Sequence, residues 1–203
     1  MRASGYIRLN KLTYIKSVGD GINSFAEFNL FGSPLDKISC DFGVSSVKGI
    51  DFAYRCLKLY GGPLYQSVEW EKPPFNLRCQ VGRVCAWGDR SAINFYKRDP
   101  VEVSELIVND ISLSIWPKFK SINDSASLSR FLLSDEDDIA WKYCNAAVRS
   151  IEYMHCVWKH KSLVEIIDTL SPFEVLIQGS IDRGVDYRDF LRRAHALLIS
   201  TED

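Results

Sequence analysis

Apolar and polar residues alternate along much of the first hundred positions of the chain. Strand-like runs cover residues 6–16, 24–32 and 35–44, and the short sequences GDG and GSP separate them as turns. This pattern predicts an antiparallel meander of three strands. Two more strands are predicted over residues 63–70 and 75–87, on either side of the break EKPP.

A helical period replaces the alternation after residue 46. In the sequence SVKGIDFAYRCLKLYGG the apolar residues recur at intervals of three and four. Ser45 or Ser46 is a suitable N-cap, and Gly61 with Gly62 supplies a C-terminal stop. We therefore predict one helix that packs on the N-terminal sheet.

The middle of the chain carries mixed signals. Asp99 followed by Pro100 is a good helix start. The next residues, PVEVSELIVNDI, fit a helix or a strand, and both interpretations stay open. The sequence SLSIWPKF favours a strand that ends at Pro117.

From about residue 123 the pattern is helical almost throughout. The predicted helices cover residues 125–133, 135–160, 162–169, 172–179 and 185–199. In the longest of them Ala140, Cys144, Ala147, Ile151, Met154 and Trp158 form an apolar stripe. Polar residues, among them Arg149 and Glu152, fill the face that we expect to meet water.

These elements predict an α+β protein with a mostly antiparallel sheet and one packed helix in the N-terminal half and a helical C-terminal half. The expected regions are residues 1–98, rich in β-structure, and residues 99–203, mainly helical. The two regions are compatible with a shared core.

Charge separates the same two halves. The net charge is −1, but residues 1–100 carry 14 Lys and Arg against 9 Asp and Glu, and residues 101–203 carry 11 against 17. The halves therefore differ in sign, +5 and −6. The basic residues are scattered singly rather than clustered, which argues against direct nucleic-acid binding.

Six cysteines raise the question of disulfides or a metal site. No signal peptide is recognisable in MRASGYIRLN, and there is no C-x-x-C pair. We expect free, mostly buried thiols, no metal and no cofactor. With no apolar run long enough to span a membrane, we expect a cytoplasmic protein that does not contact membranes.

The strongest functional signal is a run of four acids, Asp135, Glu136, Asp137 and Asp138, before Trp141. With Ser134 as N-cap, the acids would occupy the first turn of the predicted 135–160 helix, where they stabilise its N-terminus. Capping needs one or two acids, whereas four adjacent ones repel each other. A calcium loop does not fit, because the run contains no glycine. The excess charge therefore predicts a contact with a basic protein partner, with Trp141 in the same surface.

Catalytic signals are sparse. His155 and His160 are five residues apart and do not share a helix face, and Cys144 falls on the apolar stripe. His195 lies near the border of core and solvent in the last helix. An enzyme would need a dispersed site of acids and His195, in the manner of a hydrolase.

The sequence FGVSSVKGIDFAYRCLKLYGGPLYQ, residues 42–66, resembles parts of bacterial immunity proteins that protect cells from contact-dependent growth-inhibition toxins. The resemblance covers about an eighth of the chain and carries over no individual residue role. It implies a small protein that binds one toxin domain, often a nuclease with a basic cleft.

These observations together lead to one principal expectation. It is a non-enzymatic immunity protein, whose acidic surface at Asp135, Glu136, Asp137, Asp138 and Trp141 occludes the basic active site of a toxin domain. An enzyme with a dispersed acid and histidine site and an adaptor or chaperone-like scaffold stay open as alternatives.

Overall fold

The computed structural model describes most of the chain, namely residues 6–9, 12–33, 35–63, 77–87, 92–96, 98–136 and 139–202. It confirms the α+β class. The chain forms two compact units: unit 1 is Met1–Val44 with Arg78–Asn123, and unit 2 is Ser45–Leu77 with Asp124–Asp203. The units interleave along the sequence, so they do not follow the expected boundary between residues 98 and 99.

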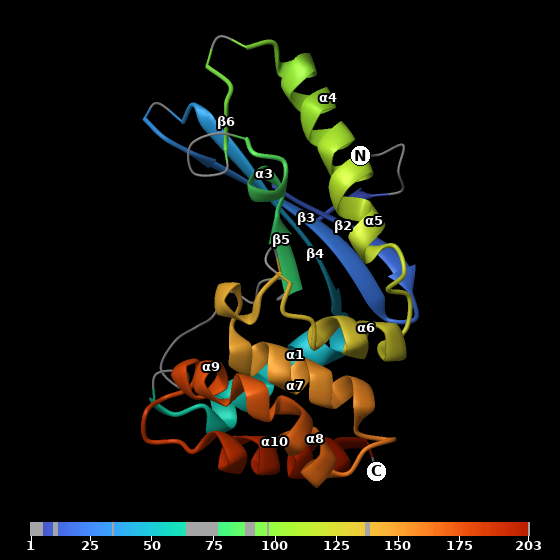
Figure 1. Ribbon diagram of the computed structural model, residues 1–203, viewed down its shortest axis with the longest axis vertical. Helices are drawn as coiled ribbons and strands as arrows, with labels where there is room; N and C mark the ends of the chain where they lie inside the picture. The colour runs from blue at the N-terminus through green and yellow to red at the C-terminus, as the bar shows by residue number, and fades with distance from the viewer. Residues whose placement is uncertain are drawn as a thin grey trace. The chain divides into compact units, whose positions relative to one another are not determined.

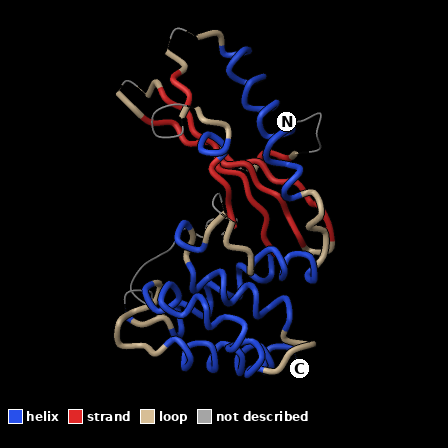
Figure 2. The backbone as a smooth tube through the Cα atoms, viewed as in Figure 1, coloured by secondary structure: helices blue, strands red, loops and turns tan. Residues whose placement is uncertain are grey.

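The sheet is drawn in red in Figure 2. Its described strands follow the order β1-β2-β3-β4-β5, and β6 pairs with β4. The antiparallel pair β2/β3 and the neighbouring β4 agree with the predicted meander. The single strand predicted over residues 6–16 was wrong, because β1 and β2 pair with each other as two antiparallel strands. A further antiparallel pair joins β4 to β6. The strands are β1 (Ile7–Arg8), β2 (Thr13–Gly19), β3 (Ile22–Phe31), β4 (Lys37–Ser46), β5 (Leu77–Gln80) and β6 (Ile93–Asn94).

The second pair of predicted strands fits less well. The run over residues 63–70 lies almost wholly outside the described residues. The run over 75–87 is a strand only at β5 and continues as the short helix α3 (Val81–Val84). The sequence VGRV of α3 is only four residues long, which is too short for periodicity to separate a helix from a strand.

One interrupted helix packs on the sheet of unit 1 (Figure 1). It consists of α4 (Pro100–Asp110), the π-helical segment η3 (Ile111–Ile115) and α5 (Trp116–Phe119). Asp99 caps it, since its carboxylate accepts a hydrogen bond of 2.8 Å from the Val101 N–H. The helix start predicted at Asp99-Pro100 is confirmed, and the open choice over 100–111 is decided in favour of the helix.

The strand predicted for SLSIWPKF was wrong. Ile111, Ile115 and Phe119 are all buried and recur every four residues, which is a helical stripe. Pro117 would clash with the carbonyl of residue 113 in a regular α-helix. The wider π-turn just before it, in which the Trp116 N–H reaches the Ile111 carbonyl, changes that spacing and lets the helix continue.

Unit 2 is built around one helix, α7 (Ala146–Val157), which contacts α1, α6, α9 and α10 (Figure 1). Its other described elements are α1 (Val47–Tyr60), α6 (Ser125–Leu132), η4 (Trp141–Tyr143), α8 (Leu163–Leu170), η5 (Ser171–Phe173), α9 (Glu174–Gly179) and α10 (Tyr187–Glu202). No helix within the described ranges has both the length and the apolar character needed to cross a membrane.

The ends of α1 form as the sequence predicts, but its predicted packing on the sheet was wrong, since α1 belongs to unit 2 and packs on α7 and α10. The Ser46 hydroxyl accepts a hydrogen bond of 3.1 Å from the Gly49 N–H, and the helix ends at Gly61. Gly62 follows with a φ of 105°, a conformation that side chains disfavour. A Cβ on Gly62 would also lie 2.5 Å from the Cβ of Asp182, so this position requires glycine for two reasons.

We expect Gly62→Ala to lower the free energy of unfolding of unit 2 by about 2 kcal/mol or more, through strain and the clash with Asp182. Urea unfolding followed by circular dichroism measures the change. Gly184→Ala is the matched control, because a Cβ there meets nothing within 4 Å. Equal effects of the two substitutions would contradict the proposed role of Gly62.

Candidate functional site

The two described acids of the run, Asp135 and Glu136, lie outside any helix. We call residues 133–140, between α6 and η4, the acidic loop; Asp137 and Asp138 lie outside the described residues. The helix predicted from residue 135 begins only at Ala146, with Asn145 as its cap: the Asn145 side chain accepts from the Val148 N–H at 3.1 Å. The expectation that Ser134 and the acids cap a helix was therefore wrong.

Arg149 organises the acidic loop from inside unit 2. The Nε of Arg149 donates to the Leu132 carbonyl at 2.8 Å, its Nη1 to the Ile139 carbonyl at 2.7 Å, and its Nη2 to the Ser134 carbonyl. The side chain is 0% exposed, so its predicted place on the wet face of α7 was wrong. One guanidinium therefore satisfies carbonyls on both sides of the acidic run.

Trp141 packs against the same guanidinium. The centre of the guanidinium lies 4.6 Å from the Trp141 ring centroid, and the ring of Phe173 stacks on Trp141 at 4.0 Å and 8°. Trp141 is 0% exposed. Its expected role as a partner contact was wrong, because a residue between the apolar core and a buried cation offers no surface to another protein.

Asp135 and Glu136 have exposed side chains. Asp135 also has an internal role, since its Oδ1 accepts a hydrogen bond of 2.7 Å from the Trp141 main-chain N–H. Burial lowers the pKa of Arg149, whereas Cys144, Asp135 and Glu152 raise it in part. Asp135 thus helps to keep the buried guanidinium charged and closes the loop around it.

Glu152 is the second charged residue that α7 buries. Its Oε1 accepts a hydrogen bond of 2.8 Å from the Ser46 N–H, at the start of α1. Burial raises the pKa of Glu152 to about 8, against the lowering effects of the hydrogen bonds from Ser46 and Ser45 and the charge of Arg149. A Cβ on Gly49 would lie 3.1 Å from the Glu152 Cγ, so the absent side chain lets the carboxyl approach the helix end.

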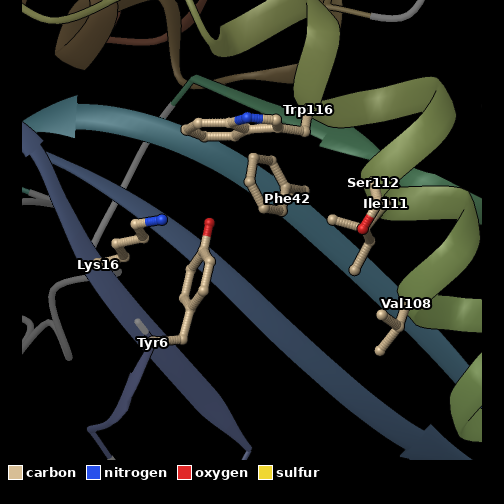
Figure 3. Close-up of a pocket in the computed structure, with 7 residues that line it drawn as sticks. All are labelled: Tyr6, Lys16, Phe42, Val108, Ile111, Ser112 and Trp116. Carbon is tan, nitrogen blue, oxygen red and sulfur yellow. The ribbon is translucent and has the colours of Figure 1, made fainter. Parts of the chain in front are cut away.

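Unit 1 contains a small cavity beside the π-helical segment (Figure 3). The Lys16 Nζ lies 5.8 Å from the Tyr6 ring centroid and 5.7 Å from that of Trp116. The Tyr6 hydroxyl shares a hydrogen bond of 2.8 Å with the Ser24 hydroxyl, and burial raises the pKa of Tyr6 to about 12. At about 110 Å³ the cavity is below the usual range for ligand sites, so we interpret this cluster as packing.

The cysteines and histidines do not gather into a reactive centre in the part of the chain that the structure describes. All six cysteines are free, as expected, and burial raises the pKa of the Cys56 thiol to about 12. The His155 ring packs against Phe52, and burial lowers the pKa of His195. No group of three or more acids, histidines or cysteines in the described ranges could hold a metal.

Comparisons with protein-family models, curated proteins and solved structures returned no match for this chain.

A signal for the buried pair was present in the sequence. Arg149 and Glu152 stand within AAVRSIEYM, whose remaining residues are apolar or small on every side of the helix. A helix that is apolar all round is a central, buried one, and charged residues on it need internal partners. Their partners could not be identified in this way, because they come from distant segments of the chain.

Proposed function

We propose that this protein is a non-enzymatic binding protein of the immunity type, which neutralises a toxin domain by covering its basic active site with the acidic loop. The observation that supports this proposal best is the anchoring of that loop by Arg149. Three main-chain carbonyls of Leu132, Ser134 and Ile139 bind one buried guanidinium. The resemblance of residues 42–66 to bacterial immunity proteins agrees with it.

Anchoring matters because the hydrogen bonds of Arg149 fix the chain on both sides of the acidic run. Residues whose backbone is already fixed lose less conformational entropy when a partner docks. Asp135 and Glu136 are presented to solvent while the loop backbone is tied down behind them. Complementary charge on a partner would speed the encounter, and the fixed loop would slow dissociation.

The partner test has two stages. Affinity-tagged protein is used to capture binding proteins from its native host, and mass spectrometry identifies them. A captured toxin domain expressed alone should arrest growth, and co-expression of this chain should restore it. If growth stays arrested at full co-expression, the immunity proposal is wrong.

Neutralising the acidic run tests the surface itself. We expect the fourfold variant Asp135→Asn, Glu136→Gln, Asp137→Asn and Asp138→Asn to slow association with the captured toxin domain about tenfold at low salt and to flatten its salt dependence. The asparagine that replaces Asp135 keeps an oxygen that can accept from the Trp141 N–H, so the fold should survive. Stopped-flow or surface plasmon resonance measures the rates.

The matched control neutralises four exposed acids elsewhere: Asp20, Glu102, Glu105 and Asp168. This variant has the same net charge as the first, so only the position of the lost charge differs. Equal slowing by both variants would show that total charge, and not the acidic loop, sets the association rate.

A further inference from the structure

Unit 1 carries a second, larger hollow, between the sheet and α4, which we call the α4 groove. Its volume is about 580 Å³, within the range of roughly 300–1,000 Å³ that small-molecule sites occupy. The sheet contributes apolar side chains from β2, β3 and β4, and α4 contributes Val103, Ile107 and Val108. Every residue of the groove belongs to unit 1.

The walls of the α4 groove leave apolar surface in contact with water. Leu12 is 37% exposed, Leu30 is 44% exposed and Val108 is 38% exposed. The rings of Tyr14 and Phe28 meet edge to face at 5.8 Å on the sheet side. Contiguous exposed apolar surface of this kind is unfavourable in water and marks places where an apolar molecule binds.

One end of the groove is cationic. Among the described residues that line the groove, Arg98 alone carries a formal charge, and it precedes the start of α4. Its side chain is exposed and makes no ion pair with any described residue, while the neighbouring Asp99 carboxylate caps α4 by accepting from the Val101 N–H. A guanidinium offers paired N–H donors that match the two oxygens of a carboxylate.

Two other lining residues, Tyr14 and Ser104, carry hydroxyl groups and no formal charge. The Ser104 hydroxyl donates to the Val101 carbonyl of its own helix at 2.8 Å. The groove thus combines an apolar length along α4 with one cation at its end that no described acid neutralises. A molecule that fits both features has an apolar body and one terminal anion.

We propose that the α4 groove binds a free fatty acid, a small amphiphile that ends in a carboxylate. The alkyl chain lies along α4, and the carboxylate contacts Arg98. The burial of alkyl surface drives binding, and Arg98 sets the orientation and selects the anion. This site is independent of the acidic loop, which lies in unit 2, so the two proposals can fail separately.

Calorimetric titration of the full chain tests the proposal with two probes below their micelle concentrations. Dodecanoate and dodecyltrimethylammonium have the same alkyl chain and opposite charges. We expect one dodecanoate per chain and at least tenfold weaker binding of the cationic probe. Arg98→Ala should reduce this preference at least tenfold, whereas Arg193→Ala, an exposed arginine on α10, should leave it unchanged.

A substitution that fills the groove tests whether dodecanoate binds inside it or elsewhere on the surface. Ser104→Trp places a large side chain in the groove and should weaken dodecanoate binding at least tenfold. Glu105→Trp is the control, on the next residue of the same helix but outside the lining. Circular dichroism checks folding, and Ser104→Phe replaces the tryptophan variant if that one fails to fold.

Absence of binding by either probe would overturn the proposal, and so would any of three other results. One is binding of dodecyltrimethylammonium as tight as that of dodecanoate. Another is dodecanoate binding that Ser104→Trp leaves intact. The third is a wild-type dimer in light scattering that Ser104→Trp converts to a monomer, because the groove would then be covered by a second copy of the chain.

Discussion

Replacing Arg149 with methionine is expected to lower the free energy of unfolding of unit 2 by about 4 kcal/mol or more. Methionine keeps an apolar stem but removes every donor, so the carbonyls of Leu132, Ser134 and Ile139 lose their partner inside the protein. A buried carbonyl without a hydrogen bond costs about 1–3 kcal/mol. The loss of the cation beside the Trp141 ring adds to this.

Urea unfolding and amide hydrogen exchange measure the effect of Arg149→Met. Exchange should accelerate most at the amides of Ile139 and Trp141, which close the loop through Glu136 and Asp135. Arg149→Lys should be intermediate, since one ammonium cannot reach all three carbonyls in the planar geometry of a guanidinium. Unchanged stability and exchange in Arg149→Met would mean that the acidic loop does not depend on this residue.

Arg192→Ala is the matched arginine control. Arg192 is exposed on α10 and makes an ion pair of 3.0 Å with Asp189 on the same helix. Exposed pairs of this kind contribute little, so the substitution should change stability by less than about 0.5 kcal/mol. The contrast between the two arginines isolates the contribution of burial.

Glu152 should make unit 2 less stable as the pH rises from about 4.5 to about 8. Its folded pKa of about 8 lies above the ordinary glutamate value of 4.5, so the folded state binds more protons than the unfolded state between these values. The free energy of unfolding therefore falls with rising pH across this window and levels off above it. Each pKa unit corresponds to about 1.4 kcal/mol, so the total is a few kcal/mol.

The difference between wild type and Glu152→Gln isolates this effect. Glutamine keeps an oxygen that can accept from the Ser46 N–H, and it cannot ionise. Glu152→Gln should be the more stable protein above pH 8, and its advantage should shrink as the pH falls toward 4.5. Thermal unfolding at a series of pH values measures both curves.

Glu165 provides a control in which stability changes with pH in the opposite direction. Hydrogen bonds from Ser162 lower the pKa of Glu165, so its ionised form stabilises the fold and that stabilisation is lost as the pH falls through the folded pKa. The advantage of wild type over Glu165→Gln should therefore grow with rising pH up to about 4.5 and then stay constant. If Glu152→Gln behaved in the same way, the assignment of a raised pKa to Glu152 would be wrong.

Local signals in the sequence predicted the elements whose ends are closed by nearby residues. Ser46 and Gly61 bound α1, and Asp99 caps α4. The alternation before residue 46 predicted the strands β3 and β4, because a half-buried antiparallel strand imposes period two on its side chains. It did not separate β1 from β2, which pair with each other within the run predicted as one strand. Caps and periodicity act over a few residues, so they can be recognised without the rest of the fold.

Signals failed where a distant contact outweighed local preference. Ser134, Asp135 and Glu136 are a good helix start, yet they form no helix, and Arg149 binds the Ser134 carbonyl instead. Leu113 and Ile115 suit a strand, but the apolar stripe through Ile111, Ile115 and Phe119 packs a helix on the sheet. In both places tertiary packing overrides propensity.

The sequence by itself determined the class of the protein, the helix caps at Ser46 and Asp99, the free thiols and the presence of four adjacent acids. Only the tertiary structure decided that Arg149 and Glu152 are internal, that Trp141 is covered, and that an apolar groove with a cationic end lies along α4. The physical reason is the distance along the chain over which each interaction acts. Capping and periodicity depend on neighbours along the chain, whereas the burial of a charge depends on partners that folding brings from elsewhere.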